Sequence, residues 1–285
     1  MATTTPSASF VEAKLQYLSK DGAAQAIYTA SEAGTPVDAK HQGQYEYHSM
    51  TIHNGRNSHN NNNENPSWSI DREGFQLLPH KSSVQDFYDD IEIERVYNTE
   101  ITNLLLQAAT GAKQIYIFDH TRRSSESGIR TARQSREPSS VIHNDYTERS
   151  ARTRLQDFVG DEQAKKFQGR FAIINVWRSI DGTIENWPLT FCDSTTLAPQ
   201  DVIPVKRMAK NRIGEIQMAS FNPDHNWYYF PQMTPAEVVL IKTYDSSPTS
   251  TGINNCTLHT AFPDPTARSD ARPRQSMETR AFVFY

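Results

Sequence analysis

The segment Val141-Ile142-His143-Asn144-Asp145-Tyr146 joins apolar, strand-forming residues to two side chains that can bind a metal. In an extended strand successive side chains point to opposite faces, so we expect His143 and Asp145 on one side and Asn144 on the other. A histidine and an aspartate at this spacing occur by chance in many chains of this size. The segment becomes significant only with a further ligand, and His259 is the candidate elsewhere in the chain.

Further segments of strand character occur on both sides of this one. Turn signals such as Asp181-Gly182, Asn222-Pro223 and Ser247-Pro248 separate them. The predicted strands cover residues 114–120, 171–180, 189–192, 215–221, 227–230, 238–244, 256–262 and 277–285. Together with the strand at His143 they make about eight or nine core strands, the number that a jelly roll needs. We therefore expect a mainly β protein with flanking helices, built as a cupin-like, double-sheet jelly roll.

Two segments have helical periodicity. The first is expected to begin at an N-cap, Ser83, to run to Ala108 and to stop at Gly111. The second runs through Leu155 to Gly160. We expect one domain over residues 1–285, in which 1–80 supply peripheral strands and a loop and 81–285 form the jelly-roll core with its helices.

Two other segments are predicted to be loops. The asparagine-rich tract 54–65 has too few apolar residues to offset the entropy of ordering it. The segment between Arg122 and Arg136 is rich in arginine and leads into the His143 strand. It is either a lid that closes over the site or a solvated connection.

Composition excludes several classes of protein. The 285 residues carry a formal net charge of only −4, which favours neither a nucleic acid nor an anionic membrane as a partner. We see no secretory signal and no apolar run long enough to span a membrane. Cys192 and Cys256 are too few for a disulfide framework. We expect a reducing, cytoplasmic setting and a small-molecule substrate, while the sequence indicates no oligomeric state.

His143, Asp145 and His259 are the candidate metal ligands and catalytic residues. In a jelly roll, strands far apart in sequence meet at the open end, which would bring His259 to the other two. Two imidazoles and one carboxylate on one face of an iron leave three open positions, the arrangement of non-haem Fe(II) oxygenases. The absence of cysteine near these residues disfavours a thiolate zinc site, although zinc on the same ligands stays open.

Arg274-Gln275-Ser276 follows His259 at the start of the last predicted strand. A guanidinium binds a carboxylate through two parallel hydrogen bonds, and Ser276 lies on the same face of the strand as Arg274. The carboxylate is most simply the distal end of 2-oxoglutarate. Arg280, on the same strand face, is the alternative for this role, or it forms a salt bridge at the rim.

Longer phrases indicate a family. They are Asn175-Val176-Trp177-Arg178, Pro188-Leu189 with Cys192-Asp193, Trp227-Tyr228-Tyr229-Phe230-Pro231, Lys242-Thr243-Tyr244-Asp245-Ser246, His259-Thr260-Ala261-Phe262 and Arg274-Gln275-Ser276-Met277-Glu278-Thr279-Arg280. With the His-x-Asp segment, they resemble the Fe(II)/2-oxoglutarate-dependent oxygenases, specifically the CmcJ/AsaB-like group, also described as GA4-desaturase-like or hydroxylase/desaturase enzymes of fungal and bacterial secondary metabolism. The likeness covers about residues 116–285.

The resemblance implies a double-stranded β-helix, Fe(II) on His143, Asp145 and His259, and 2-oxoglutarate held by Arg274 and Ser276. It also implies dioxygen as oxidant, with ascorbate as a candidate reductant. The expected activity is hydrogen abstraction from a small natural product or amino acid. The outcome would be hydroxylation, desaturation or oxidative cyclisation, which includes aziridine formation from a valine-like amino acid.

Two alternatives from other classes stay open. An iron oxidase of the isopenicillin-N-synthase type would use the same Arg-x-Ser phrase for its substrate's carboxylate and would not consume 2-oxoglutarate. A jelly-roll binding protein would hold an inert metal. Succinate release separates the first alternative from an oxygenase, and turnover separates the second.

Several other residues have two interpretations. Arg178 either forms a buried ion pair, with Asp193 as the candidate partner, or clamps a substrate carboxylate. Tyr229 and its aromatic neighbours are expected in the core and the wall of the substrate pocket. His120 and His225 are rival metal ligands, but each lacks a carboxylate at strand spacing, so we expect neither to bind the metal.

Overall fold

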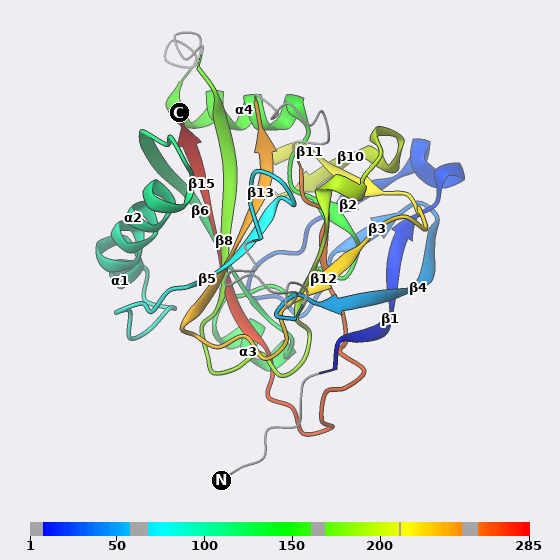
Figure 1. Ribbon diagram of the computed structural model, residues 1–285, viewed down its shortest axis with the longest axis horizontal. Helices are drawn as coiled ribbons and strands as arrows, with labels where there is room; N and C mark the ends of the chain where they lie inside the picture. Colours follow the sequence, from blue (N-terminus) through cyan, green and yellow to red (C-terminus); the bar gives the residue numbers. More distant parts are fainter. Residues whose placement is uncertain (1–7, 58–67, 161–168, 211, 247–255) are drawn as a thin grey trace.

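The computed structural model describes residues 8–57, 68–160, 169–210, 212–246 and 256–285, which form two curved, facing β-sheets (Figure 1). The larger sheet has the strand order β1-β4-β12-β9-β14-β7-β11-β10-β2-β3 and the smaller one the order β5-β13-β8-β15-β6. Many neighbours in both orders, such as β9 and β14 or β8 and β15, are far apart in the chain. The predicted jelly roll is confirmed.

The strands of the larger sheet are β1 (Phe10–Leu18), β2 (Ile27–Thr29), β3 (Lys40–Gln42), β4 (Tyr45–Asn54), β7 (His143–Asn144), β9 (Leu189–Cys192), β10 (Val202–Ala209), β11 (Arg212–Ala219), β12 (Trp227–Tyr229) and β14 (His259–Ala261). The smaller sheet contains β5 (Phe75–Pro79), β6 (Gln114–Ser124), β8 (Phe171–Ser179), β13 (Glu237–Asp245) and β15 (Gln275–Phe284). The helices are α1 (Asp90–Glu92), α2 (Asn98–Ala108), α3 (Ser127–Ala132) and α4 (Glu148–Val159). A π-helical turn, η2 (Ile93–Tyr97), joins α1 to α2, and the 3-10 turns are η1 (Lys20–Gln25), η3 (Ser194–Thr196) and η4 (Pro199–Asp201).

The two faces of the smaller sheet have different partners. Ala172, Ile174 and Val176 of β8 join a core cluster with Ile101 and Leu105 of α2, so this face packs under the helices. Figure 1 shows α1 and α2 beside β6 and β15, on the side away from the larger sheet. Because side chains alternate along a strand, the residues between these positions point into the space between the sheets.

Aromatic side chains fill part of the interior between the two sheets. Trp177 of β8 and Phe75 of β5 pack with Phe191 of β9 in the other sheet and with Phe230, which follows β12. The rings of Phe75 and Phe191 are stacked at 5.2 Å. Each such ring buries on the order of 150–250 Å². The cluster therefore fixes how the sheets face one another, and with it the positions of polar residues on the same strand faces.

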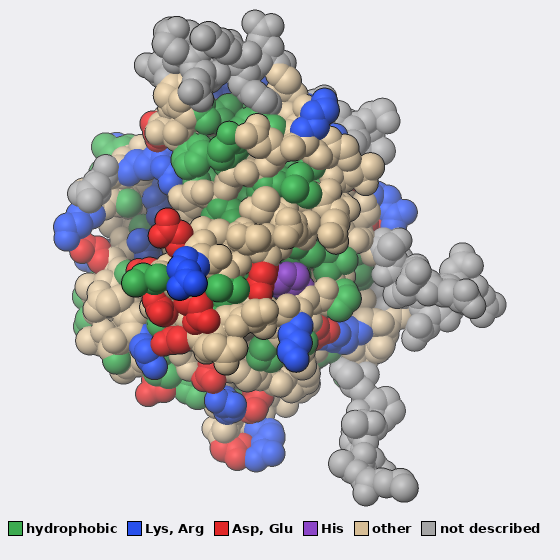
Figure 2. All heavy atoms as spheres, turned by 90° about the vertical axis from the view of Figure 1, so that its left-hand side faces the viewer, with side chains coloured by type: hydrophobic (Ala, Val, Ile, Leu, Met, Phe, Trp, Pro, Cys, Tyr) green, Lys and Arg blue, Asp and Glu red, His purple; other side chains and the backbone are tan. Residues whose placement is uncertain are grey.

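The outer surface over α1 and α2 is acidic. Figure 2 looks onto this side and shows acidic side chains gathered on it. Asp86, Asp89, Asp90 and Glu94 are exposed there. No helix within the described part of the chain is long and apolar enough to cross a membrane.

The predicted start of the first helix is wrong. Helical structure begins at Asp90, and the side chain of Asp89, not of Ser83, caps it by accepting hydrogen bonds from the backbone N–H groups of Ile91 and Glu92. The backbone N–H of Ser83 instead donates to Glu100 at 2.8 Å. The segment before Asp89 is therefore tied to the helix by side-chain carboxylates rather than being part of it.

Other predicted elements agree with the structure or fall outside it. The helix ending at Gly160 and the strands at 171–180 and 189–192 are confirmed as α4, β8 and β9. Of the predicted loop at 54–65, Asn54 ends β4 and residues 58–65 lie outside the described ranges. β10 was not predicted, while β4 and β5 lie in the region 1–80, for which peripheral strands were expected without individual bounds.

Candidate functional site

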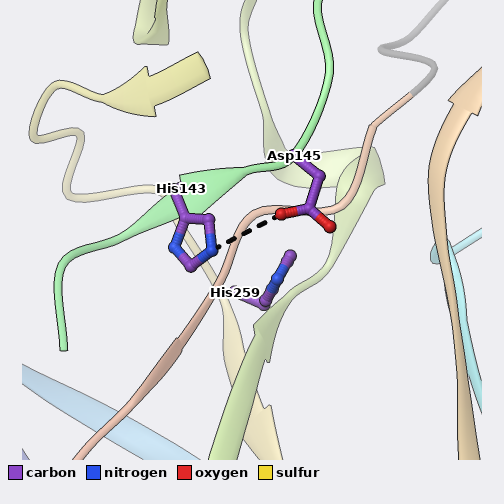
Figure 3. A group of neighbouring side chains, drawn as sticks. All are labelled: His143, Asp145 and His259. Carbon is purple, nitrogen blue, oxygen red and sulfur yellow. Dashed lines mark ion pairs between the residues drawn. The ribbon is translucent and has the colours of Figure 1, made fainter. Parts of the chain in front are cut away.

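His143 and His259 face one another across two adjacent strands of the larger sheet. β14 pairs with β7 so that His259 lies opposite His143, and the two imidazole rings are 4.5 Å apart between centroids. Asp145 follows β7 directly, and its Oδ1 lies 3.8 Å from Nε2 of His143. One ligand atom from each of the three residues lies within 4.8 Å of the others. Figure 3 shows the three side chains pointing toward a common point.

Backbone carbonyls fix the tautomer of both histidines. Nδ1 of His143 lies 2.8 Å from the carbonyl oxygen of Val141, and Nδ1 of His259 lies 2.9 Å from that of Thr257. A carbonyl only accepts, so each Nδ1 carries the proton and each Nε2 keeps its lone pair. This is the way in which metal-binding histidines are usually oriented.

Asp145 is held through one oxygen and presents the other. Its Oδ2 accepts hydrogen bonds from Asn175 Nδ2 at 2.8 Å and from Arg280 Nε at 2.9 Å. The contact with His143 Nε2 is made by Oδ1. The carboxylate is thus oriented so that Oδ1 faces the two imidazoles.

The charges favour the protonation states that a metal needs. Burial, and after it the neighbouring His259, lowers the pKa of His143 to about 3, so this imidazole is neutral at pH 7. Burial alone would raise the pKa of Asp145, but Arg280, the two imidazoles and Asn175 hold that pKa well below its usual value. The group therefore presents the neutral imidazole of His143 and the carboxylate of Asp145.

One buried nitrogen atom is placed to act as a metal ligand. Nε2 of His259 is buried and has no hydrogen-bond partner among the described residues. A buried polar atom without a partner costs on the order of 1–3 kcal/mol. A cation between the three residues would remove that cost, and nitrogen and carboxylate donors without thiolate suit Fe(II).

Arg274 and Ser276 lie between the sheets, as the predicted strand face requires. The guanidinium donates to the carbonyl of Trp187 at 2.8 Å and to Ser276 Oγ at 3.0 Å, and it lies over the ring of Trp177. Burial lowers the pKa of Arg274 to about 9. Within the described ranges no carboxylate forms an ion pair with it. A buried guanidinium in this position is suited to bind an anionic group from outside the chain.

Arg280 has its partners within the protein. Besides Asp145, its guanidinium contacts Asp119 at 2.6 Å and Glu278. Arg280 therefore anchors Asp145, a candidate metal ligand. The roles expected for Arg280 from the sequence, binding a cosubstrate carboxylate or forming a salt bridge at the rim, did not include this one.

Arg178 and Tyr229 lie apart from the candidate metal group. Arg178 belongs to the β8 face under the helices, where its guanidinium lies over the rings of Phe87 and Tyr97 and donates to the carbonyls of His80 and Pro235. The predicted ion pair with Asp193 is wrong, because the Asp193 carboxylate accepts from Thr195 instead.

Tyr229 is buried in a core cluster with Trp227 and Phe262. The rival histidines have other partners: His120 Nδ1 lies 2.8 Å from Thr279 Oγ1, and His225 Nε2 lies 3.1 Å from Asp201. Neither belongs to the group of three ligand atoms.

A cavity of about 550 Å³ opens beside the site, within the usual size range of small-molecule pockets. His143 and Asp145 line it together with Asp119, Arg123 and Arg136. The arginine-rich segment is therefore not only a solvated connection: Arg122 and Arg123 belong to β6, and Arg130 of α3 is buried and paired with Asp38.

Asn175 is the site residue that sequence reasoning missed. It stands in the apolar run Ile173-Ile174-Asn175-Val176-Trp177, and it is fully buried. A lone amide in a buried strand must have a partner, which was the available signal. The identity of that partner, Asp145, depends on how the two sheets face one another.

Comparisons with known proteins agree with this geometry. A family model described as "Oxidoreductase/YMDC permease-like domain" matches residues 15–284. The alpha-ketoglutarate-dependent dioxygenase phiK of a fungal species is 30% identical over 224 residues, 76% of this chain and 80% of that protein. Hydroxylase/desaturase CTB9 of Cercospora beticola is 28% identical over 85% of this chain and 78% of its own length.

A solved structure also matches. The iron and alpha-ketoglutarate-dependent endoperoxidase NvfI superposes with a TM-score of 0.80, covering 98% of this chain and 99% of its own, at 24% identity. At this identity the match concerns the fold alone.

Proposed function

Because the chain belongs to the Fe(II)/2-oxoglutarate-dependent oxygenases, we propose that His143, Asp145 and His259 ligate the iron and that Arg274, with Ser276, binds the distal carboxylate of 2-oxoglutarate. The protein is an oxidoreductase that uses Fe(II), 2-oxoglutarate and dioxygen on a small molecule. An oxidase that leaves 2-oxoglutarate unconsumed and a non-catalytic binding protein are therefore set aside.

The observation that carries the assignment is the buried Nε2 of His259, which has no partner among the described residues and faces His143 and Asp145. When bound, the iron with its cosubstrates supplies the power to remove hydrogen from an unactivated carbon, while 2-oxoglutarate is converted into succinate and carbon dioxide. The chain's own residues orient the donors and keep the site apart from bulk water.

The cosubstrate assignment rests on Arg274. Its guanidinium is buried, lies beside Ser276 on the inner face of β15, and has no carboxylate partner within the described part of the chain. Arg280, the alternative, is already engaged by Asp119, Asp145 and Glu278. A free dicarboxylate gains more from the first guanidinium than from the second.

The substrate proposed is a small natural product or an amino acid. Hydroxylation, desaturation and oxidative cyclisation, which includes aziridine formation from a valine-like amino acid, are the outcomes that this chemistry allows. We further propose that residues 1–285 act as one domain, since β1 and β4 belong to the same sheet as β7 and β14. We also propose a cytoplasmic setting without nucleic-acid or membrane partners, which the small formal net charge of −4 favours.

The test is anaerobic titration of the Fe(II)-loaded protein with 2-oxoglutarate, followed by the visible charge-transfer absorption of the chelated iron. The variant His259→Ala should lose Fe(II) binding. Arg274→Ala should keep Fe(II) but require at least about tenfold more 2-oxoglutarate, because a charge-assisted hydrogen bond is lost. Arg272→Ala, a change at an exposed guanidinium paired with Asp181, serves as the matched control. An unchanged 2-oxoglutarate requirement in Arg274→Ala would refute the cosubstrate assignment.

A further inference from the structure

Three arginines from separate parts of the chain line the cavity beside the proposed iron site. Arg123 comes from β6, Arg136 from the segment after α3, and Arg207 from β10. Backbone hydrogen bonds hold the first two segments together: the N–H of Ser124 donates to the carbonyl of Arg136 at 2.8 Å, and the N–H of Arg136 donates to that of Arg122 at 3.0 Å. The guanidinium of Arg207 lies over the ring of Tyr28 at 5.9 Å.

These three side chains, here called the arginine cluster, are close enough to affect one another. Burial, followed by the charges of Arg123 and Arg207, lowers the pKa of Arg136. All three line the same cavity as His143 and Asp145, so the cluster lies beside the proposed iron ligands. Like charges that line one cavity repel, so an anion bound among the three guanidinium groups would relieve that repulsion.

The protein does not supply that anion among its described residues. Arg123 donates to the carbonyl of Glu137, and none of the three guanidiniums forms an ion pair within the described ranges. The carboxylate of Glu137 feels the charge of Arg123, but its hydrogen bonds are accepted from Ser31 Oγ at 2.7 Å and from the N–H of Ala39 at 2.9 Å.

The carboxylates that line the cavity are engaged elsewhere. Glu32 pairs with Lys210 and Glu215 with Arg149, while Asp119 and Asp145 both pair with Arg280. The wall therefore carries positive charge that the described side chains leave unbalanced, next to a space large enough for a small molecule.

We propose that the arginine cluster binds an anionic oxygen group of the primary substrate, a carboxylate or a phosphate, and thereby holds the rest of that substrate against the iron site. A planar guanidinium fork matches both groups. The inference rests on the proposed function, which places the iron at His143 and Asp145. It assigns the substrate to the anionic small molecules.

The test uses matched pairs of probes: phenylacetate against phenylacetamide, hexanoate against hexanamide, and phenyl phosphate against phenol. Each is titrated calorimetrically into the full chain loaded with Mn(II) and saturated with 2-oxoglutarate, so that the cosubstrate site is already filled. We expect the anion of at least one pair to bind at least about tenfold more tightly than its neutral partner. The pair that shows the preference distinguishes carboxylate from phosphate.

The variants Arg136→Gln and Arg207→Gln should remove this preference. Arg212→Gln is the matched control, because Arg212 lines the same cavity but is paired with Asp157 at 3.1 Å. Each of the first two variants removes one positive charge and so relieves repulsion within the cluster. We therefore expect their melting temperatures to be close to that of the wild-type protein or higher.

Two results would overturn the inference: no preference for the anion in any pair with the wild-type protein, or a requirement for 2-oxoglutarate that rises in Arg136→Gln and Arg207→Gln. The second would assign the cluster to the cosubstrate. The titrations are repeated on metal-free protein, where the preference should persist because none of the three arginines is a proposed metal ligand. Failure of the iron site is thus distinguished from failure of the arginine cluster.

Discussion

Two hydrogen bonds to backbone carbonyls determine which ring nitrogen of His143 and of His259 is left with a lone pair for a metal. Each carbonyl, of Val141 and of Thr257, belongs to the residue two positions earlier, so the extended backbone that carries the histidine also fixes its tautomer. The two histidines were proposed as metal ligands from their residue type and from the family phrases. The sequence could not predict the tautomers, because these depend on ring orientation within the folded strand.

Asn175 supports Asp145 through one hydrogen bond, which it donates to Oδ2 at 2.8 Å. Replacing it with alanine should weaken Mn(II) binding by about 10–100-fold, the usual cost of losing an outer partner of a metal ligand. The measurement is a Mn(II) titration followed by electron paramagnetic resonance. The control is Asn226→Ala at an exposed position. Unchanged affinity in Asn175→Ala would show that Asp145 needs no such support.

The side chain of Arg280 links three strands, because it joins β15 to β6 and to the residue that follows β7. Three carboxylates, of Asp119, Asp145 and Glu278, share this guanidinium. The variant Arg280→Met leaves them without their cation and should lower the free energy of unfolding by about 3–5 kcal/mol. Urea denaturation measures it.

Arg272→Met is the comparison for that variant, because this exposed pair with Asp181 should contribute no more than about 1 kcal/mol. Adding Asp119→Asn to Arg280→Met should restore part of the loss, since one unpaired carboxylate is removed. Equal stability of Arg280→Met and Arg272→Met would contradict the account of this cluster.

The start of α4 follows the proposed ligands closely, and Thr147 caps it. Its Oγ1 accepts from the N–H of Ser150 and donates to Glu215 at 2.6 Å. Thr147→Ala should cost about 0.5–2 kcal/mol, which corresponds to a fall in melting temperature of about 2–4 °C per kcal/mol. Differential scanning calorimetry tests this against Thr153→Ala, an exposed residue of the same helix. A similar fall in both variants would mean that the cap is not the cause.

The elements that the sequence predicted well are those whose pattern is local, such as β8, β9 and α4. β10 escaped prediction although it contains Val202, Ile203 and Val205, and Pro204 interrupts its pattern. The proline is tolerated because β2 pairs only with Lys206–Met208, so the missing N–H is not required on that side. The false helix start at Ser83 arose because buried Val84 and Phe87 mimic helical spacing in a segment that the carboxylates of Glu92 and Glu100 tie down.

At the scale of the whole molecule, the sandwich brings residues from opposite ends of the chain to one point. The jelly roll and the convergence of His143, Asp145 and His259 were predicted from strand count and family phrases. The face of Arg178, the pairing of Arg280 with Asp145 and the arginine cluster were not, because each depends on the register between strands that are distant in sequence.

A metal that joins β7 to β14 should stabilise the whole fold. Mn(II) at about a hundred times its dissociation constant should add about 2.7 kcal/mol to the free energy of unfolding, because the unfolded chain does not bring the three ligands together. Asp145→Ala, which removes one proposed ligand, should show little of this gain in a thermal denaturation series. A gain of equal size in that variant would place the metal elsewhere.

The most direct test of the central claim is a crystal structure of the protein grown without oxygen in the presence of Mn(II) and 2-oxoglutarate. We expect the metal on Nε2 of His143, Oδ1 of Asp145 and Nε2 of His259, with the distal carboxylate of 2-oxoglutarate on Arg274. A metal bound by other atoms, or His259 turned away from the other two residues, would contradict it.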